Sequence, residues 1–343
     1  MPTKTINLAL QGGGAHGAFT WGVLQALLED ERLDFHTITS TSAGSMNGAV
    51  MATGLLKGGP KEAIGLLETF WHRVSQAGRY GIFSAPNVMQ DWMSSTGRMA
   101  ANAFAGFEMM SYFFSPYQFN PLDYNPLQKI IADMVDFPLL QKSDKIALHI
   151  CATDVKRSQI KIFSGKELSA DALLASSCLP QIFQAVEIKG HYYWDGGYLG
   201  NPPLFPLTRC KYSQDMLIVQ IDPILVGEVP KTGEAIADRL NEINFNSPLL
   251  MELRGLEHIN RLLRKGYLSK ESGQRELYVH LIGDDEAMGA LSLESKFNPE
   301  WDFLNGLRDT GHRRAKAWLS RHFDDIGQKS SVDLETLLAL DAA

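Results

Sequence analysis

The chain has 343 residues, of which 45% are hydrophobic and 21% charged, a balance typical of a globular protein with a sizeable core. Its formal net charge of −7 argues against nucleic acid as a partner and offers no polybasic patch for anionic lipid. The three cysteines, an odd number without metal-ligand spacing, favour a reducing compartment. The sequence shows neither an apolar leader nor a run of ~20 apolar residues, so we expect a cytoplasmic protein.

The first fifty residues predict the order strand, glycine turn, helix, strand, sharp turn, helix. Apolar alternation indicates strands at 5–10 and 35–39, and apolar residues at helical spacing indicate helices at 18–29 and 47–56. Both strand-to-helix turns would lie at the C-terminal edge of a parallel sheet, where open α/β proteins place their sites. The sequence therefore predicts an α/β fold with a site built on these two turns.

The first turn is rich in glycine. Gly12, Gly14 and Gly17 match the G-x-G-x-x-G pattern of dinucleotide-binding loops. That function requires an acidic residue at the end of the second strand to hold a ribose, whereas residues 37–40 are not acidic and Asp34 precedes the strand. An oxyanion hole requires less, namely two or three backbone amides aimed at one oxygen without a Cβ in the way.

The second turn carries a serine at its apex. Ser42 lies between two small residues, Ser40 and Gly44, which allow the flanking backbones of a strained elbow to approach each other. Its hydroxyl would project at a helix N-terminus, where partial positive charge favours a developing oxyanion. The alternative is a plain helix N-cap, because serine is a favoured capping residue.

An amphipathic helix is predicted at 62–74, and after it the segment 80–120 is rich in methionine and aromatic residues and poor in charge. Such surfaces are adaptable, which suits a lid or an acyl-chain channel. The alternatives are ordinary core of an inserted helical layer, a face that dips into a bilayer, and a homodimer interface. As substrate-binding side chains of this segment we expect Trp92, Phe107, Met110 and Phe113.

The middle of the chain predicts further strands, and one of them ends in a carboxylate. A hairpin of strands at 184–188 and 192–194 delivers Asp195, which two glycines follow. Asp-Gly is also a strong turn signal, so a plain turn is the alternative. Beyond residue 230 the sequence shifts towards charge and helix, with helices predicted at 233–244, 249–264 and 301–323 and a strand at 276–282.

Taken together, three motifs form a more specific pattern. In chain order they read Gly12-Gly13-Gly14-x-x-Gly17, Ser42-x-Gly44 and Asp195-Gly196-Gly197. In order and spacing they resemble the patatin-like phospholipase family of lipid acyl hydrolases, over roughly residues 5–225. The chain departs from the family pattern at Ser40, usually a glycine, and at His16, which stands where an arginine is common.

The resemblance implies a three-layer α/β/α fold with a mostly parallel central sheet. The composition adds an inserted apolar helical region and a C-terminal helical extension to this fold. Residues 1–230 would form the catalytic domain, with a lid-like insertion at about 80–120, and residues 231–343 a mostly helical extension packed on it. The implied activity is hydrolysis of carboxylic esters of fatty acids. The apolar character of 80–120 adds transient contact with a membrane or lipid surface as one possible use of that segment.

The resemblance also implies a two-residue dyad. Ser42 would be the nucleophile, Asp195 its base, and the amides of Gly12, Gly13 and Gly14 the oxyanion hole. Burial would have to raise the pKa of Asp195 for it to act as a base at neutral pH. The scheme requires neither a metal nor another cofactor.

Several alternatives stay open. A Ser-Asp-His triad needs a histidine after Asp195 at the same sheet edge, while His16 in the glycine loop is placed to touch substrate. A dinucleotide-binding oxidoreductase using residues 12–17 and a catalytically inactive lipid-binding protein are the other classes. The candidates for the third member of a triad fall in predicted helices or a strand: His258, His280, His312 and His322.

Overall fold

The computed structural model describes residues 3–80, 115–269 and 273–338, and within them eight strands form one sheet. The order is β5-β6-β3-β2-β1-β7-β8, with β4 paired to β3. Pairing is parallel from β3 through β2, β1 and β7 to β8, and antiparallel where β4, β5 and β6 join. The strands are β1 (Lys4–Leu10), β2 (Leu33–Thr41), β3 (Ala147–Asp154), β4 (Gln159–Ser164), β5 (Val186–Ile188), β6 (His191–Asp195), β7 (Asp215–Val219) and β8 (Tyr278–Ile282).

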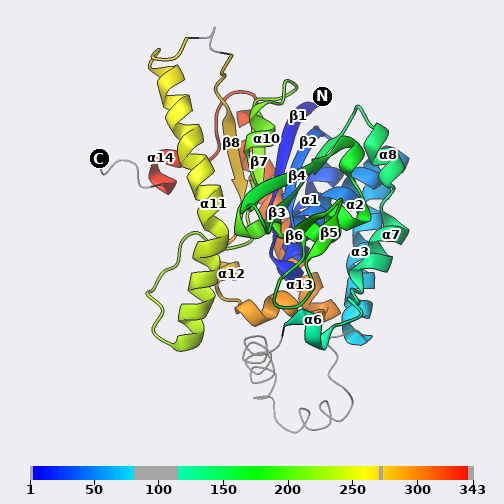
Figure 1. Cartoon of the computed structure of the whole chain (residues 1–343). Coiled ribbons are helices and arrows are strands. Elements are labelled where there is room, and N and C mark those ends of the chain that lie inside the picture. Colours follow the sequence, from blue (N-terminus) through cyan, green and yellow to red (C-terminus); the bar gives the residue numbers. More distant parts are fainter. Residues whose placement is uncertain (1–2, 81–114, 270–272, 339–343) are drawn as a thin grey trace.

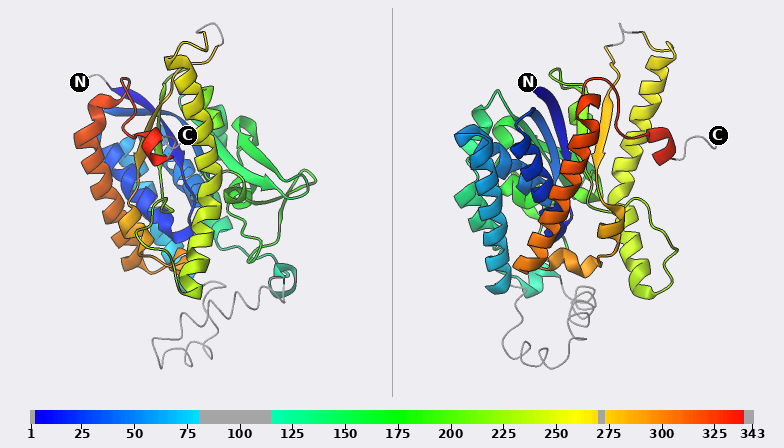
Figure 2. Two further views of the ribbon diagram at one scale, coloured as in Figure 1. Left: turned by 90° about the vertical axis from the view of Figure 1, so that its left-hand side faces the viewer. Right: turned by 180° about the vertical axis from the view of Figure 1, so that it is seen from behind.

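Helices cover both faces of this sheet (Figure 1). On one face lie α11 (Gly233–Arg264), α10 (Phe205–Thr208) and α14 (Leu334–Leu337). On the other lie α1 (Gly17–Asp30), α2 (Ala43–Gly58), α3 (Pro60–Tyr80) and α13 (Trp301–His322), as the side and rear views show (Figure 2). The predicted three-layer α/β/α fold with a mostly parallel sheet is confirmed. The remaining helices of the described residues are α6 (Pro116–Phe119), α7 (Leu127–Met134), α8 (Phe137–Lys142), α9 (Ala170–Ser176) and α12 (Asp285–Gly289), with the 3₁₀ turns η1 (Gly14–His16), η2 (Gly165–Glu167), η3 (Gly196–Tyr198), η5 (Leu293–Phe297) and η6 (Phe323–Asp325).

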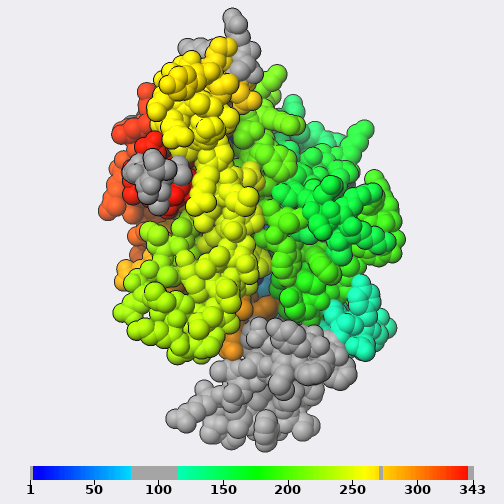
Figure 3. Space-filling view, turned by 60° about the vertical axis from the view of Figure 1, so that its left-hand side comes forward, coloured from blue at the N-terminus to red at the C-terminus, as the bar shows by residue number. Residues whose placement is uncertain are grey.

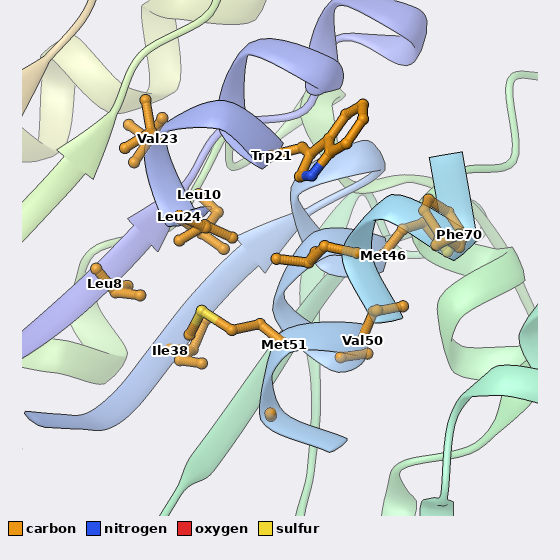
Figure 4. Packing of buried hydrophobic residues seen from close by; sticks show 14 of the residues in the cluster. Leu8, Leu10, Trp21, Val23, Leu24, Ile38, Met46, Val50, Met51 and Phe70 are labelled. Carbon is orange, nitrogen blue, oxygen red and sulfur yellow. The ribbon is translucent and has the colours of Figure 1, made fainter. Parts of the chain in front are cut away.

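Strand side chains alternate between two apolar cores. On β7, Leu217 and Val219 belong to the core beneath α1 and α13, whereas Met216 and Ile218 belong to the core beneath α11. This follows from strand geometry, because successive side chains point to opposite faces of the sheet. A sheet covered on both faces explains why its parallel strands read as nearly continuous apolar runs. Figure 4 shows part of the first core, where β1 and β2 pack against α1 and α2.

The register of the sheet brings distant segments to one edge. Thr41 of β2 is opposite Cys151 of β3, and the next residue of β3, Ala152, is opposite Asp195 of β6. The C-terminal end of β1 lies beside that of β2 at the same level. The residues that follow β1 and β2 therefore meet the last residue of β6, although they are far apart in sequence.

The region beyond residue 230 both covers the sheet and joins it. The strand β8 pairs in parallel with β7 at the edge of the sheet. The two helices predicted at 233–244 and 249–264 are one helix, α11, with Pro248 inside it, so the predicted break was wrong. A proline inside a helix costs about 3 kcal/mol or more, and burial of the apolar face of α11 offsets that cost. This face contains Leu249, Leu253 and Leu256.

Most of the predicted apolar segment 80–120 lies outside the described residues. Trp92, Phe107, Met110 and Phe113 all fall there, so their substrate contacts stay predictions. The division of the chain at residue 230 also stays a prediction. No helix within the described part of the chain has the length and apolar character needed to cross a membrane.

Candidate active site

Ser42 is the single residue between β2 and α2. Its backbone has φ 53° and ψ −124°, a conformation that residues with a Cβ rarely adopt and that costs about 1–3 kcal/mol. The turn is so tight that a Cβ on Gly44 would lie 2.3 Å from the carbonyl oxygen of Leu10. The Ser42 side chain makes no capping hydrogen bond to α2, a helix that is described throughout. The structure therefore shows a strained elbow rather than a plain N-cap.

A second serine holds this elbow from the neighbouring helix α9. The Ser42 backbone N–H donates to Ser176 Oγ at 2.9 Å, and that hydroxyl also lies 3.1 Å from Ser45 Oγ. Ser176 is fully buried. The bond satisfies a backbone donor at the start of α2 and fixes the orientation of the elbow. This role was not predicted, because a serine in a helix carries no sequence signal for a contact with residue 42.

Asp195 ends β6 and is only 2% exposed. Its carboxylate accepts a hydrogen bond of 2.7 Å from the Gly197 N–H and lies close enough to the Ser42 side chain to interact with it. Thr153 Oγ1 donates to the Asp195 carbonyl oxygen at 2.8 Å and fixes the end of the strand. Burial raises the pKa of Asp195 to about 6, while the Gly197 N–H, the Ser42 side chain and the charge of Lys296 oppose the rise. This carboxylate is a stronger base than a free aspartate.

The glycine loop between β1 and α1 passes beside the elbow. Gly13 and Gly14 line the cavity next to it, and Gly14 has a φ of +58°, a conformation that favours glycine. Their N–H groups have no acceptor among the described residues. The N–H of Gly12, by contrast, donates to Asn201 Oδ1 at 2.7 Å. Gly13 and Gly14 therefore line the cavity with N–H groups that no described residue accepts from, whereas the N–H of Gly12 holds the loop in position.

A buried amide network anchors the loop. Gln11 Oε1 accepts hydrogen bonds from the N–H groups of Ile221 at 2.6 Å and Asp222 at 2.8 Å, just after β7. Gln11 Nε2 donates to Asn246 Oδ1 on α11 at 2.8 Å and to the carbonyl of Asn201 at 3.3 Å. Such a satisfied buried network holds a segment in one conformation. It was not predicted, because its members come from four separate parts of the chain.

His16 fastens the loop to the C-terminal region instead of lining the cavity. Its Nε2 lies 2.7 Å from Ser295 Oγ in η5, and Ser295 already donates its hydroxyl proton to the carbonyl of Ser292. The His16 Nε2–H is therefore the donor of this bond. Burial, aided by the charge of Lys296, lowers the pKa of His16 to about 3, so the ring is neutral. Direct contact between His16 and substrate, which the sequence left open, is not supported.

The cavity beside Ser42 has a volume of about 740 Å³. Helix α3 and residues 177–183 form part of its wall, and α11 and residues 293–299 form another part. Among its described lining residues the only ionisable carboxylate is Asp195 and the only cation is Lys296. A largely apolar cavity of this size suits an acyl chain next to a few polar groups. Its apolar walls include Met46, Phe70, Trp71, Ile182, Phe183 and Phe245.

The four histidines considered for a triad do not line this cavity. His280 Nε2 lies 2.9 Å from Asp215 Oδ1, and Asp215 is the first residue of β7, at the opposite edge of the sheet from Ser42. The other three lie on α11 and α13, where each contacts another side chain. The described residues therefore provide a serine and an aspartate without a third member.

The fold and the site define a class: three-layer α/β proteins with a serine at a strand-to-helix elbow, a glycine loop beside it and a buried aspartate facing it. A family model described as patatin-like phospholipase matches residues 8–208, more than half of the chain. The chain belongs to the patatin-like phospholipase family, a family of lipid hydrolases. This match removes the main support for a dinucleotide-binding protein, which rested on glycine spacing alone.

Similar solved structures include VipD from Legionella pneumophila, at 15% identity and a TM-score of 0.38, with 90% of this chain and 67% of that chain covered. The ExoU–SpcU complex from Pseudomonas aeruginosa matches at 16% identity and a TM-score of 0.36, with 92% of this chain covered. The match covers 52% of that chain, so the present chain spans about half its length. No curated protein matches the chain.

Proposed function

We propose that the protein is a serine-dependent lipid acyl hydrolase that cleaves carboxylic esters of fatty acids through an acyl-enzyme on Ser42. The observation that carries the proposal is that Ser42, at a strained elbow, and the buried carboxylate of Asp195 line the same largely apolar cavity. A strained elbow and a carboxylate with a raised pKa are typical of functional sites. Family membership supports the same reaction class.

In the first half of the reaction, Asp195 takes the proton of the Ser42 hydroxyl while Oγ attacks the ester carbonyl carbon. The carbonyl oxygen becomes an oxyanion, which the N–H groups of Gly13 and Gly14 stabilise. Gly12 supports this pair indirectly, because its own N–H is bonded to Asn201. Collapse of the intermediate breaks the ester C–O bond, and the leaving alkoxide takes the proton from Asp195.

In the second half, water attacks the acyl-enzyme and Asp195 takes one of its protons. The same two amides stabilise the second oxyanion, and its collapse breaks the bond between the acyl carbon and Ser42 Oγ. The proton on Asp195 returns to Ser42, and a fatty acid leaves. Because the pKa of Asp195 is about 6, the side chain is mostly ionised at neutral pH and close enough to neutrality to exchange a proton.

Hydrolysis of p-nitrophenyl acyl esters of increasing chain length tests this proposal. We expect turnover by the wild-type protein to rise with chain length, because longer chains bury more surface on the apolar walls. Ser42→Ala should abolish turnover, and Ser320→Ala, which removes an exposed hydroxyl from α13, is the matched control. Absence of turnover at every chain length would favour the alternative of a lipid-binding protein without catalysis.

The expected partners follow from this chemistry. The substrate is an ester of a fatty acid, and the protein must meet it at a membrane or another lipid surface. A contact through residues 80–120 and a homodimer remain predictions, since most of that segment lies outside the described residues. A cytoplasmic location likewise remains a prediction.

A further inference from the structure

The long helix α11 presents one face to solvent over its whole length. Figure 3 shows this helix, in yellow and yellow-green, along the surface of the molecule. From Ile236 to Lys265, exposed residues recur at every third or fourth position. Residues at this spacing share one face of a helix. They form a continuous row, which we call the outer stripe, on the side of α11 that faces away from the sheet.

The first half of the outer stripe is apolar. Ile236, Leu240 and Ile243 are 44%, 55% and 47% exposed, and Met251 is 70% exposed. None of the four belongs to an apolar core of the described residues. A row of apolar side chains that stays outside the core is typical of a contact surface. The first half of the stripe is therefore available for contact with something other than the sheet.

The second half of the outer stripe is basic. Arg254, Arg261 and Lys265 are all exposed, and His258 lies among them. Within the described ranges, neither Arg254 nor Lys265 has an ion-pair partner. The net charge of −7 predicted no basic patch for anionic lipid, and for this face that prediction was wrong. Net charge does not record which residues share a face of a helix.

The carboxylates in the same part of the helix point away from the stripe. Residues 249–265 contain only two acidic residues, Glu252 and Glu257. Glu252 accepts hydrogen bonds of 2.9 Å and 2.8 Å from two backbone N–H groups at the start of α10. Glu257 is buried and forms an ion pair with Arg264. The positive charge of the stripe is therefore not neutralised by a carboxylate of its own helix on the same face.

The apolar half of the stripe lies next to the cavity. Asn241, Asn244 and Phe245 belong to the same part of α11 and line the cavity. Leu240 and Ile243 directly precede these lining residues in the chain, so they lie within one turn of the cavity wall. A surface that contacts the apolar half of the stripe would therefore lie beside the cavity as well.

We propose that the outer stripe of α11 docks the protein on an anionic lipid surface. The apolar half inserts between the lipid head groups, while Arg254, Arg261 and Lys265 contact the anionic head groups themselves. A helix with an apolar part and unpaired cations on one exposed face is suited to lie in such an interface, and long cationic side chains reach the head groups while their stems stay in contact with apolar groups. This inference goes beyond the proposed function, because docking does not require hydrolysis at Ser42.

A second copy of the chain fits the stripe less well. If two α11 helices packed antiparallel along their full length, the basic half of each would face the apolar half of the other. Parallel packing would place the cations of the two copies against each other. Both arrangements are unfavourable, because a cation buried against apolar groups loses its hydration and like charges repel. A lipid surface offers both acyl chains and anionic groups, which together complement the two halves of the stripe.

The test measures sedimentation of the full chain with vesicles of ether-linked phosphatidylcholine, with and without ether-linked phosphatidylglycerol. We expect wild type to bind the anionic vesicles more tightly and to release them as salt is added. The combined change Arg254→Gln, Arg261→Gln and Lys265→Gln should weaken this binding by roughly 5-fold for each cation, on the order of 100-fold in all. Binding to the neutral vesicles should change far less.

A matched control removes the same charge from other faces of the molecule. Lys61, Lys129 and Lys145 are exposed residues of α3, of α7 and of the segment before β3. Their combined substitution by glutamine changes the net charge equally and should leave vesicle binding close to that of wild type. An equal loss in this control and in the stripe variant would show a general charge effect and overturn the proposal.

The apolar half has its own test. Leu240→Gln should weaken binding to both kinds of vesicle by roughly 10-fold, because it removes a side chain that would be buried in the lipid. Leu122→Gln, at a residue 91% exposed in the loop after α6, is the control. Absence of wild-type binding to anionic vesicles would overturn the proposal. A dimer in analytical ultracentrifugation that Leu240→Gln dissociates would overturn it too and assign the stripe to a second copy.

The choice of lipid separates this inference from the proposed function. Ether-linked lipids contain no carboxylic ester, so their binding is measured without turnover. The stripe variants should hydrolyse a soluble short-chain p-nitrophenyl ester at the wild-type rate, because they leave the cavity unchanged. If wild type cleaves no ester at all, the proposed function fails while vesicle binding still decides the role of the stripe. If wild type cleaves esters without binding anionic vesicles, only the docking proposal fails.

Discussion

The segment that matches the family model and the region that follows it contribute different parts of the site. Residues 8–208 contain the elbow serine, the buried aspartate and the glycine loop. The region beyond them contains β7, β8 and α11, and its residues 293–299 and Lys296 form a wall of the cavity. We therefore expect bond cleavage to depend on the first region, and substrate selection and loop position to depend on both regions.

The largest expected effect lies in the first region. Asp195→Asn should lower kcat by on the order of 10³-fold or more, because an amide cannot take the serine proton. The fold should persist, since the new side chain keeps an oxygen that can accept the Gly197 N–H. Hydrolysis assays with Asp133→Asn, an exposed aspartate paired to Arg73, as the control check this prediction. Retained turnover in the Asp195 variant would exclude the dyad.

The same variant has a second, opposite effect on stability. The pKa of Asp195 is raised in the folded state from 3.8 to about 6, so ionisation of this group destabilises the fold as pH rises from about 4 to 6, by about 3 kcal/mol once complete. Asp195→Asn removes this cost and should raise the free energy of unfolding at pH 7. Denaturant unfolding at pH 4 and pH 7 measures the difference in free energy of unfolding between the variant and wild type. An equal difference at the two pH values would contradict the raised pKa of Asp195.

A substitution at the elbow should lower the stability of the fold. Gly44→Ala would place a Cβ 2.3 Å from the carbonyl oxygen of Leu10, where backbone must move, so we expect a loss of about 2 kcal/mol or more of stability together with activity. Gly65→Ala is the control, since an added Cβ on this exposed residue of α3 meets nothing within 4 Å. It should stabilise the protein by up to about 1 kcal/mol. A folded, active Gly44 variant would show that the elbow is looser than described.

The pH dependence of activity tests the same carboxylate. Because Asp195 must be ionised to take the serine proton, kcat/KM should be constant above pH ~7 and fall about tenfold per pH unit below pH ~6. If Asp195 had the pKa of a free aspartate, the fall in kcat/KM would begin near pH 4. A kcat/KM that stays constant down to pH 5 would contradict the raised pKa of Asp195.

The smallest expected effect comes from a substitution in the second region. It tests whether that region positions the glycine loop. Ser295→Ala leaves the buried Nε2–H of His16 without its acceptor, so the glycine loop should lose part of its fixed position. We expect kcat to fall roughly 3- to 10-fold with KM nearly unchanged, because the amides act on the transition state. Ser320→Ala is the control. An unchanged kcat would show that the contact with Ser295 in the second region does not affect catalysis.

The parts that local signals describe were predictable from sequence. Small residues flank Ser42 in one strand-to-helix turn, glycines follow β1 in the other, and Asp195 follows an aromatic strand. Each feature can therefore be recognised from a few neighbouring residues. The three-layer fold follows from the same alternation of strands and helices. The family match of residues 8–208 is consistent with these motifs.

The remaining parts depend on contacts between distant segments. The bond from Gly12 to Asn201, the Gln11 network and the Lys296–Asp222 pair join residues that no spacing rule connects. Helix α11 continues through Pro248 because the packing of its apolar face on the sheet outweighs the cost of a proline inside a helix. Helix propensity, which depends only on local sequence, does not reveal this packing. The wall of the cavity that α11 and residues 293–299 form was not predicted, because it too depends on contacts between distant segments.

The central claim is that Ser42 is the nucleophile, and covalent labelling tests it most directly. An alkyl fluorophosphonate reacts with an activated serine, with loss of fluoride, and the adduct is located by mass spectrometry of peptides. The account predicts one adduct, on Ser42, that forms slowly or not at all in the Asp195→Asn variant. A label on a different serine, or rapid labelling of Ser42 without Asp195, would contradict it.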